Sequence, residues 1–197
     1  MSSPTSETSI PRRRAKIELV LIAALFAVPL IASYLAFFVW RPAGRVNYGD
    51  LLDVRPLADT ALRHLDGRTF RFAELRGKWV MVTIDAGACA RPCEAKLFMM
   101  RQQRLMQGRE MERVERVFLV EDDAPLSTML LREFDGTRVL RASGSPLLNA
   151  FPAQSARRDH IYLIDPRGNL MMRFPRAPDP NLMKKDIDLL FKAQGAA

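Results

Sequence analysis

Cysteine and histidine are scarce in this sequence, which contains two of each among its 197 residues. A structural zinc site takes four ligands of these types, usually at characteristic close spacings. His64 is expected at the surface, whereas His160 opens an apolar segment far along the chain. The scarcity argues against zinc and directs attention to the two cysteines, Cys89 and Cys93, which lie close together.

A clustered basic surface is also missing, although the formal net charge is +8. Outside Arg12–Arg14, basic residues are scattered among acidic ones, and no aromatic residues are interleaved with them in the way that single-stranded nucleic acid requires. The charge is therefore typical of a solvated surface, and we expect no nucleic-acid partner. No internal repeat occurs, and no motif indicates a small-molecule substrate.

Charged residues are absent from Leu19 to Trp40, a run long enough to span a bilayer. A secretory signal has a shorter apolar stretch that ends in small residues, whereas this run ends in bulky Phe37–Trp40. Arg12–Arg14 and Lys16 precede the run, and Arg41 alone follows it closely. The excess of positive charge before the run predicts a cytoplasmic N-terminus, a single pass through the inner (cytoplasmic) membrane and a periplasmic C-terminal domain.

The chain divides into four predicted segments. Residues 1–18 form a cytoplasmic tail, residues 19–40 a transmembrane helix, residues 41–64 a linker and residues 65–197 the folded domain. The linker is predicted because its prolines and glycines come with little periodicity. A domain outside the membrane lies in a compartment that is usually oxidising and lets disulfides persist.

Beyond residue 65, apolar runs rich in β-formers alternate with helical patterns. Trp79–Ile84 and the segment that starts at Arg116 are typical of strands buried on both faces. A helix is predicted from Pro92 to Gln107, and His160–Phe174 predicts a strand, a tight turn and a second strand. The alternation of strands and helices indicates an α/β fold.

The two cysteines occupy the junction between the first buried strand and the helix that follows it. Pro92 suits the first turn of that helix, and a helix N-terminus favours the thiolate form of cysteine. If residues 89–93 form one helical turn, both sulfur atoms lie on the same face and a disulfide is plausible. Such a short loop restrains the unfolded chain little, which favours a functional bridge over a structural one.

The residues alone leave the chemistry of the pair open. A redox couple usually has two intervening residues, whereas Cys89 and Cys93 have three. Two thiolates and one imidazole form a soft ligand set that suits copper, with His160 as the candidate imidazole. A histidine at the start of a strand is equally often structural. The methionines of the predicted helix, at helical spacing, are expected to fill the core.

The segments "LDGRTFRFAELRGKWVMVTI", "CARPC" and "YLIDPRGNLMMRF" resemble the thioredoxin-like superfamily and, within it, the Sco family of copper chaperones. The resemblance covers about residues 65–195. It implies a thioredoxin-like fold, with a central mixed sheet flanked by helices, preceded by one transmembrane helix. One feature of thioredoxin-like folds is missing, because no proline for the usual cis-proline position occurs between Pro152 and Pro166.

The resemblance also implies a function. Sco proteins bind copper, Cu(I) or Cu(II), through two cysteines and a histidine, which correspond here to Cys89, Cys93 and His160. They act as metallochaperones in cytochrome c oxidase assembly and pass copper or reducing equivalents to the oxidase subunit that carries the dinuclear copper centre. Two alternatives remain: a thiol–disulfide oxidoreductase with a redox-active cysteine pair on the outer side of the membrane, and a non-catalytic assembly factor.

Overall fold

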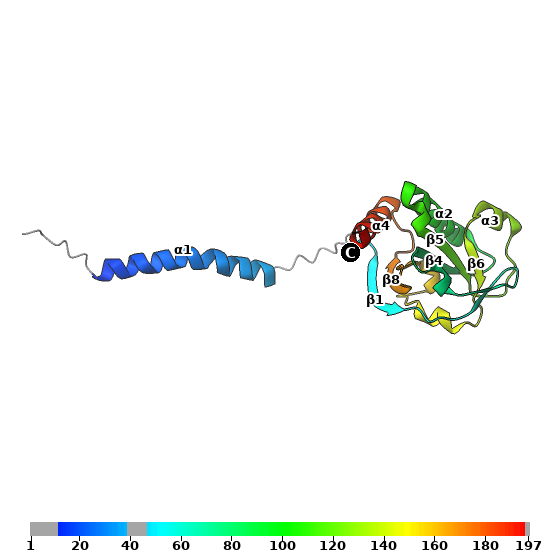
Figure 1. Ribbon diagram of the computed structural model, residues 1–197, viewed down its shortest axis with the longest axis horizontal. Coiled ribbons are helices and arrows are strands. Elements are labelled where there is room, and N and C mark those ends of the chain that lie inside the picture. Colours follow the sequence, from blue (N-terminus) through cyan, green and yellow to red (C-terminus); the bar gives the residue numbers. More distant parts are fainter. Residues whose placement is uncertain (1–11, 39–46, 196–197) are drawn as a thin grey trace, which may run out of the picture. The chain divides into compact units, whose positions relative to one another are not determined.

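The computed structural model describes residues 12–38 and 47–195. The chain separates into two compact units, residues 1–45 and residues 46–197. Among the described residues, the first unit contains one long helix, and the second contains a sheet with its covering helices (Figure 1). The predicted tail before residue 12 and the residues between the two described ranges lie outside the described residues.

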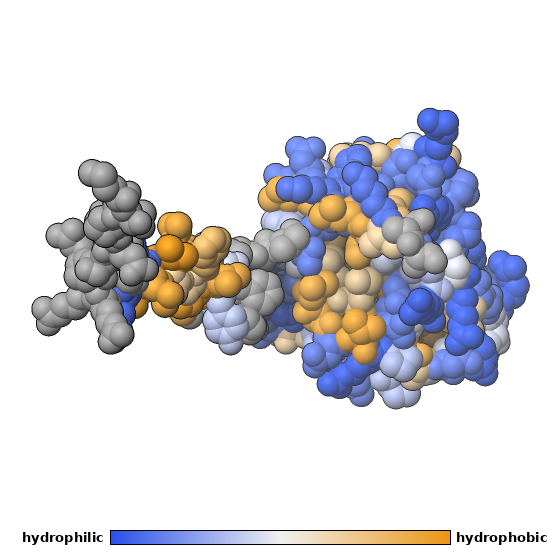
Figure 2. Space-filling view, turned by 60° about the vertical axis from the view of Figure 1, so that its left-hand side comes forward, coloured by the Kyte–Doolittle hydropathy of each residue, from blue (hydrophilic) through white to orange (hydrophobic). Residues whose placement is uncertain are grey.

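The first unit consists of α1 (Arg12–Phe38), with Pro29 inside it. The stretch Lys16–Ala36 is long and apolar enough to cross a membrane, and none of it is buried in the protein. Figure 2 shows the hydrophobic side chains that cover this helix, in contrast to the mainly hydrophilic surface of the folded domain. A buried core helix would instead hide its apolar residues, so α1 fits a single-pass membrane anchor. Trp40, the predicted end of the span, lies outside the described residues.

The second unit is built on one eight-stranded mixed sheet with the order β1-β8-β7-β4-β5-β6-β2-β3. The strands β4, β5 and β6 run parallel to one another, and the remaining neighbours pair antiparallel. The predicted α/β architecture is confirmed. The strands are β1 (Asp50–Pro56), β2 (Leu62–His64), β3 (Thr69–Phe70), β4 (Trp79–Asp85), β5 (Val114–Val120), β6 (Arg138–Arg141), β7 (Ile161–Ile164) and β8 (Asn169–Phe174).

Helices cover both faces of this sheet. The α-helices α2 and α4 pack on one face, where Met100 of α2 and Met183 of α4 are fully buried. Short 3-10 helices cover the other face, where Leu147 packs beside Tyr162 and Ile84. The predicted role of Met100 as core filler is confirmed. The helices are α2 (Arg91–Met106), α3 (Thr128–Glu133), α4 (Pro180–Gly195), η1 (Phe72–Leu75), η2 (Gly108–Arg113), η3 (Pro146–Ala150) and η4 (Arg157–Asp159).

The predicted linker over residues 41–64 differs from the structure. Strands β1 and β2 lie within it, and both are hydrogen-bonded into the sheet of the second unit. The strand β1 lacks the regular alternation of a half-buried strand because its pairing with β8 shifts register between Leu51 and Arg55. An irregular edge strand of this kind gives no clear periodic pattern in the sequence.

A buried lysine joins three segments at the end of β4. Lys96 of α2 is 4% exposed, and its ammonium group donates to Asp85 Oδ2 at 2.8 Å, to the Ile84 carbonyl at 3.3 Å and to the Arg158 carbonyl. These three acceptors match the three donors of the ammonium group. Desolvation lowers the pKa of Lys96, and the Asp85 carboxylate opposes that shift. The ion pair thus fixes α2 and η4 against the end of β4.

We expect Lys96→Met to destabilise the second unit by about 3 kcal/mol, because it leaves the Asp85 carboxylate buried without its cation. The variant Lys96→Met/Asp85→Asn should lose less than the two single variants together, since the uncompensated charge is gone. Denaturant unfolding of the full chain in detergent, followed by the fluorescence of buried Trp79, measures both effects. Lys185→Met, at an exposed lysine of α4, is the matched control, and equal stability of Lys96→Met and this control would contradict the assignment.

Candidate functional site

The cysteine loop connects the end of β4 to the start of α2 and is held by the loop that follows β5. The Gly87 amide donates to Asp122 Oδ1 at 2.8 Å, and the same oxygen accepts from the Ala124 amide at 3.2 Å. A Cβ atom at Gly87 would lie 2.3 Å from the Ala124 carbonyl oxygen, so the close approach requires glycine. The carbonyl of Asp85 also accepts from the Glu121 amide at 3.0 Å. These contacts fix the backbone that leads into the first cysteine.

Cys89 and Cys93 form a disulfide, with their Cα atoms 5.2 Å apart. The sequence pattern allowed residues 89–93 to form one helical turn. In the structure they do not, because α2 begins at Arg91. Cys89 instead adopts a left-handed backbone conformation with φ of 34°, a region that costs a non-glycine residue about 1 kcal/mol. Its amide donates to the Ala86 carbonyl at 3.1 Å. A strained residue that the surrounding structure holds in place is a common feature of functional sites.

Both cysteines are buried against apolar side chains. Cys89 is 5% exposed and Cys93 is 1% exposed, and they pack with Leu97, Phe118 and Leu130. Cys93 is the third residue of α2, so its sulfur lies in the first turn, where the helix dipole favours an anion. Reduction would therefore produce a thiolate at a favourable position, and Cys89, the more exposed of the two, is the better placed to meet a partner.

Charged groups surround the end of β4 beside the cysteine loop. The ammonium of Lys96 pairs with Asp85, and the guanidinium of Arg158 pairs with Glu121. The hydrogen bond to Glu121 raises the pKa of Arg158. Glu121, Asp122 and Asp123 follow β5, at the sheet end that carries the cysteines. The first two do act there, as an ion-pair partner and as a backbone acceptor.

His160 immediately precedes β7 and is 8% exposed. Its Nδ1 lies 2.9 Å from the Phe174 carbonyl oxygen, which can only accept, so Nδ1 carries a proton and donates. Its Nε2 is buried and has no hydrogen-bond partner among the described residues. In the neutral ring this atom keeps its lone pair, which is the arrangement of a histidine that can bind a metal ion.

The ring of His160 and the two sulfur atoms pack against different clusters of side chains. His160 contacts the Tyr162 ring, with the centroids 5.8 Å apart, and Tyr162 packs with Ile84 on the face opposite α2. Cys93 packs with Phe118 on the face that α2 covers. Within residues 12–38 and 47–195, no three His, Cys, Asp or Glu side chains are grouped to hold a metal ion. The closed disulfide thus does not fit copper, and the role of His160 as the third ligand stays a prediction.

The segment just before β7 takes an unusual form. It consists of η4, whose Arg158 carbonyl accepts from the buried Lys96, and η4 contacts β4. The described peptide bonds include no cis bond, in agreement with the absence of proline from the sequence here. A lysine from α2 therefore fixes this segment. The burial of Lys96 was not predicted from the sequence, because a lysine in a helix is normally exposed. One sequence feature could have indicated this burial: Lys96 follows Cys93 by three residues and therefore lies on the same face of the helix.

Solved structures with the same fold include several Sco proteins. Yeast Sco1 with copper bound is 18% identical, with a TM-score of 0.56, and the match covers 76% of this chain and 95% of that one. ScoI of Bradyrhizobium japonicum with copper bound is 19% identical, with a TM-score of 0.53 over 68% of this chain and 98% of that one. BsSco, a cytochrome c oxidase assembly protein of the Sco family with a disulfide switch, is 15% identical, with a TM-score of 0.53 over 72% of this chain and 96% of that one.

The predicted thioredoxin-like fold is confirmed by a family model of that fold, and the Sco structures share it. No curated protein has a sequence significantly similar to this chain. The family model "Transmembrane-like, thioredoxin-like, C-terminal domain" matches residues 79–194, which is more than half of the chain and extends from β4 through the cysteine pair into α4. The chain belongs to the family of transmembrane-like, thioredoxin-like C-terminal domains.

Proposed function

We propose that this chain is a membrane-anchored, Sco-like protein that acts in cytochrome c oxidase assembly through its Cys89–Cys93 pair. The observation that carries the proposal is the disulfide at the N-terminus of α2, on a fold shared with copper-bound Sco proteins. The pair alternates between a disulfide and a dithiol. The disulfide form is the one that the structure describes, and the dithiol form is the one that binds copper as cargo.

The chemistry of the pair follows from thiol–disulfide exchange. The thiolate of an external dithiol attacks one sulfur of the disulfide, and a mixed disulfide forms as the other cysteine leaves as a thiolate. The second thiol of the external donor then releases the mixed disulfide, so that the donor is oxidised and the chain gains two electrons and two protons. Two soft thiolates at Cys89 and Cys93 then bind Cu(I), and His160 Nε2 is the proposed third ligand.

The burial of the pair gives the cargo site a physical advantage. Apolar side chains around Cys93 exclude water, and the first turn of α2 stabilises negative charge on its sulfur. For His160 to join, its ring must come to the cysteine loop from its place beside Tyr162. Burial raises the pKa of Tyr162 to about 12, so its hydroxyl stays protonated and donates to the Pro152 carbonyl at 3.0 Å.

A thiol–disulfide oxidoreductase is the second candidate function, and the closed disulfide itself favours it. In this case the reduced pair passes its two electrons to a disulfide of a partner and returns to the bridged form. The proposed partner is the same in both candidates: the oxidase subunit that carries the dinuclear copper centre. The two candidates differ in whether the dithiol form carries copper when it meets that partner.

The copper proposal predicts that the reduced full chain in detergent binds Cu(I) tightly, because two thiolates are then available. Cys89→Ser and Cys93→Ser should each abolish tight binding, and His160→Ala should weaken it about tenfold, equivalent to about 1.4 kcal/mol. Titration with a competing Cu(I) chelator measures the affinities. His64→Ala, at the only other histidine, is the matched control. Reduced wild-type chain that binds copper no better than the double serine variant would exclude copper as cargo.

The same pair should be essential in cells. We expect Cys89→Ser/Cys93→Ser to be produced and membrane-bound, because the anchor is intact, but to leave the oxidase without its dinuclear copper centre. The optical and magnetic signals of that centre in purified membranes are the measurement. In cells that lack the chain, the cargo role is supported if added copper restores assembly and added reductant does not. Full assembly with the double variant would instead support a non-catalytic assembly factor.

The proposed orientation of the anchor rests on the distribution of charge. Arg12–Arg14 and Lys16 lie at the start of α1, and this excess of positive charge supports a proposed orientation with the N-terminus in the cytoplasm and the cysteine pair on the periplasmic side. We expect a protease added to spheroplasts to digest the C-terminal domain and to spare a tag fused before Met1. Protection of the domain until the cells are lysed would show the opposite orientation.

A further inference from the structure

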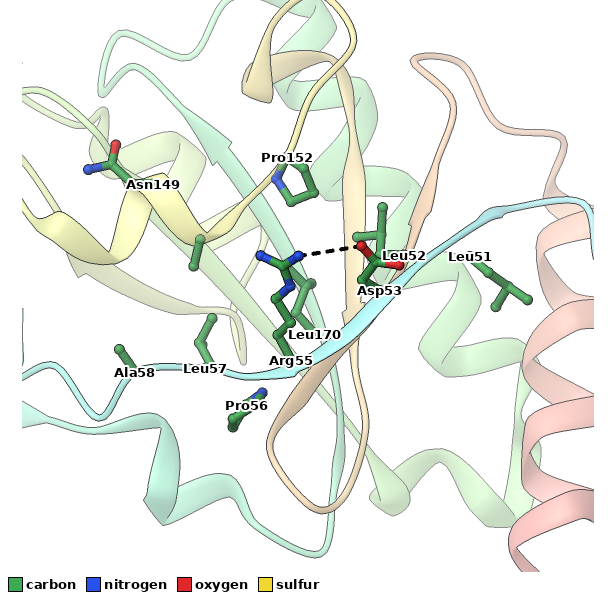
Figure 3. Close-up of a pocket in the computed structure, with 11 residues that line it drawn as sticks. Leu51, Leu52, Asp53, Arg55, Pro56, Leu57, Ala58, Asn149, Pro152 and Leu170 are labelled. Atoms are coloured by element: carbon green, nitrogen blue, oxygen red, sulfur yellow. Dashed lines mark hydrogen bonds and ion pairs between the residues drawn. The ribbon is translucent and has the colours of Figure 1, made fainter.

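Residues 149–158 line two surface cavities of the second unit. The first cavity has a volume of about 520 Å³ and lies between this segment and β1, with Asn149 and Pro152 on one wall (Figure 3). Its charged side chains, Arg55 and Asp53, lie 3.4 Å apart and compensate each other. The lining of the first cavity therefore presents no net charge to a ligand.

The second cavity has a volume of about 430 Å³ and lies beside the cysteine loop. Glu121 lines it, and the Glu121 amide donates at 3.0 Å to the carbonyl of Asp85, where β4 ends. Arg158 also lines it, and the Arg158 carbonyl accepts from the buried ammonium group of Lys96. The parallel strands β4 and β5 both end at this edge of the sheet. Ligands of α/β proteins usually bind at the carboxyl ends of such strands.

The lining of the second cavity is positively charged. It includes two arginines and one glutamate, which gives a net charge of +1. Arg158 pairs with Glu121. The neighbouring carboxylate of Asp159 pairs with Arg176 at 3.4 Å. The guanidinium of Arg157 thus has no hydrogen-bond or ion-pair partner among the described residues.

Arg157 is partly buried, and its positive charge acts on Tyr162. Burial raises the pKa of Tyr162 to about 12, and the charges of Arg173 and Arg157 oppose this shift. The ring of Tyr162 packs edge-to-face on Phe151, which lines the cavity, with the ring centroids 5.0 Å apart. The guanidinium of Arg157 therefore lies near an aromatic wall of the cavity, where an ion pair is screened less than at an open surface.

The segment before η4 also carries backbone donors. The N–H groups of Ala153, Ser155 and Ala156 have no hydrogen-bond acceptor within the part of the chain that the structure describes. An extended polypeptide can hydrogen-bond to such groups, which favours a peptide over a free anion as the occupant of the cavity.

We propose that the second cavity receives an acidic side chain from an extended segment of the partner protein, and that Arg157 binds its carboxylate. The inference deepens the proposed function and rests on it. A guanidinium and a carboxylate form two parallel hydrogen bonds, so Arg157 fixes the orientation of the segment as well as its position.

This contact serves the exchange of disulfides. Both sulfur atoms of the pair are buried, so a partner must be held closely for its own sulfur to reach Cys89. A carboxylate bound beside the cysteine loop holds the partner there and raises the rate of exchange without taking part in it. One sulfur of the partner then bonds to one sulfur of the chain, and the other cysteine leaves as a thiolate.

Exchange with charged peptides tests the proposal. The oxidised full chain in neutral detergent is mixed with Cys-Gly-Glu-Glu-Gly, Cys-Gly-Gln-Gln-Gly or Cys-Gly-Lys-Lys-Gly, each acetylated and amidated. The thiols released at Cys89 and Cys93 are trapped with an alkylating agent and counted by mass spectrometry. We expect the Glu peptide to react about tenfold faster than the Gln peptide, and the Lys peptide to react slowest. Equal rates for the Glu and Gln peptides would overturn the proposal.

Variants assign the preference to Arg157. Arg157→Gln should abolish the advantage of the Glu peptide, and Arg157→Glu should transfer it to the Lys peptide. Arg167→Gln, in the exposed turn after β7, removes the same charge and is the matched control, with the preference of the wild-type chain. A preference that survives in Arg157→Gln, or that falls equally in Arg167→Gln, would show attraction by the net charge of the chain and contradict the assignment.

Dithiothreitol, an uncharged dithiol, separates this inference from the proposed function. It should open the disulfide of every variant at the same rate, because the substitutions leave the cysteine pair unchanged. Chains that react with dithiothreitol but show no charge preference would overturn the role of the cavity and leave the proposed function standing. A disulfide that neither dithiothreitol nor any peptide opens would overturn the proposed exchange and this inference with it.

Discussion

The ammonium group of Lys96 is the contact on which the geometry of the cysteine pair depends. It is buried, and its three acceptors come from the end of β4 and from η4, while the lysine itself belongs to α2. These three segments surround the loop that carries Cys89. Asp122 also fixes this loop, by accepting from the Gly87 amide. The contacts of Lys96 and Asp122 thus hold the loop in which Cys89 adopts its left-handed conformation. The disulfide joins Cys89 to Cys93 in the first turn of α2.

The two proposed activities use the same cysteine pair in different chemical states. The disulfide leaves no thiolate for a metal ion, so copper requires prior reduction. The reduced pair can also give two electrons to a partner disulfide. Bound copper prevents this exchange because it occupies both thiolates. Burial of both sulfur atoms limits either reaction to partners that approach the cysteine loop closely. Under this proposal, delivery of copper and transfer of reducing equivalents alternate on the same two cysteines.

Segments with one strong pattern were predictable from the sequence. The absence of charge indicated α1, the continuous apolar run indicated β4, and Pro92 before a periodic stretch indicated α2, which the structure begins one residue earlier at Arg91. Features that depend on tertiary contacts were not predictable. A register shift hides the pattern of β1, and Lys96 is buried only because three distant acceptors surround it. The place of His160 beside Tyr162 likewise depends on how β7 enters the sheet.

The central claim is that Cys89 and Cys93, once reduced, bind copper directly. X-ray absorption at the copper edge tests it most directly, with the reduced full chain in detergent loaded with less than one equivalent of Cu(I). The account predicts a first coordination shell dominated by two sulfur atoms, and a shell with fewer sulfur atoms in Cys93→Ser. A first shell of nitrogen and oxygen alone in the wild-type chain would contradict it.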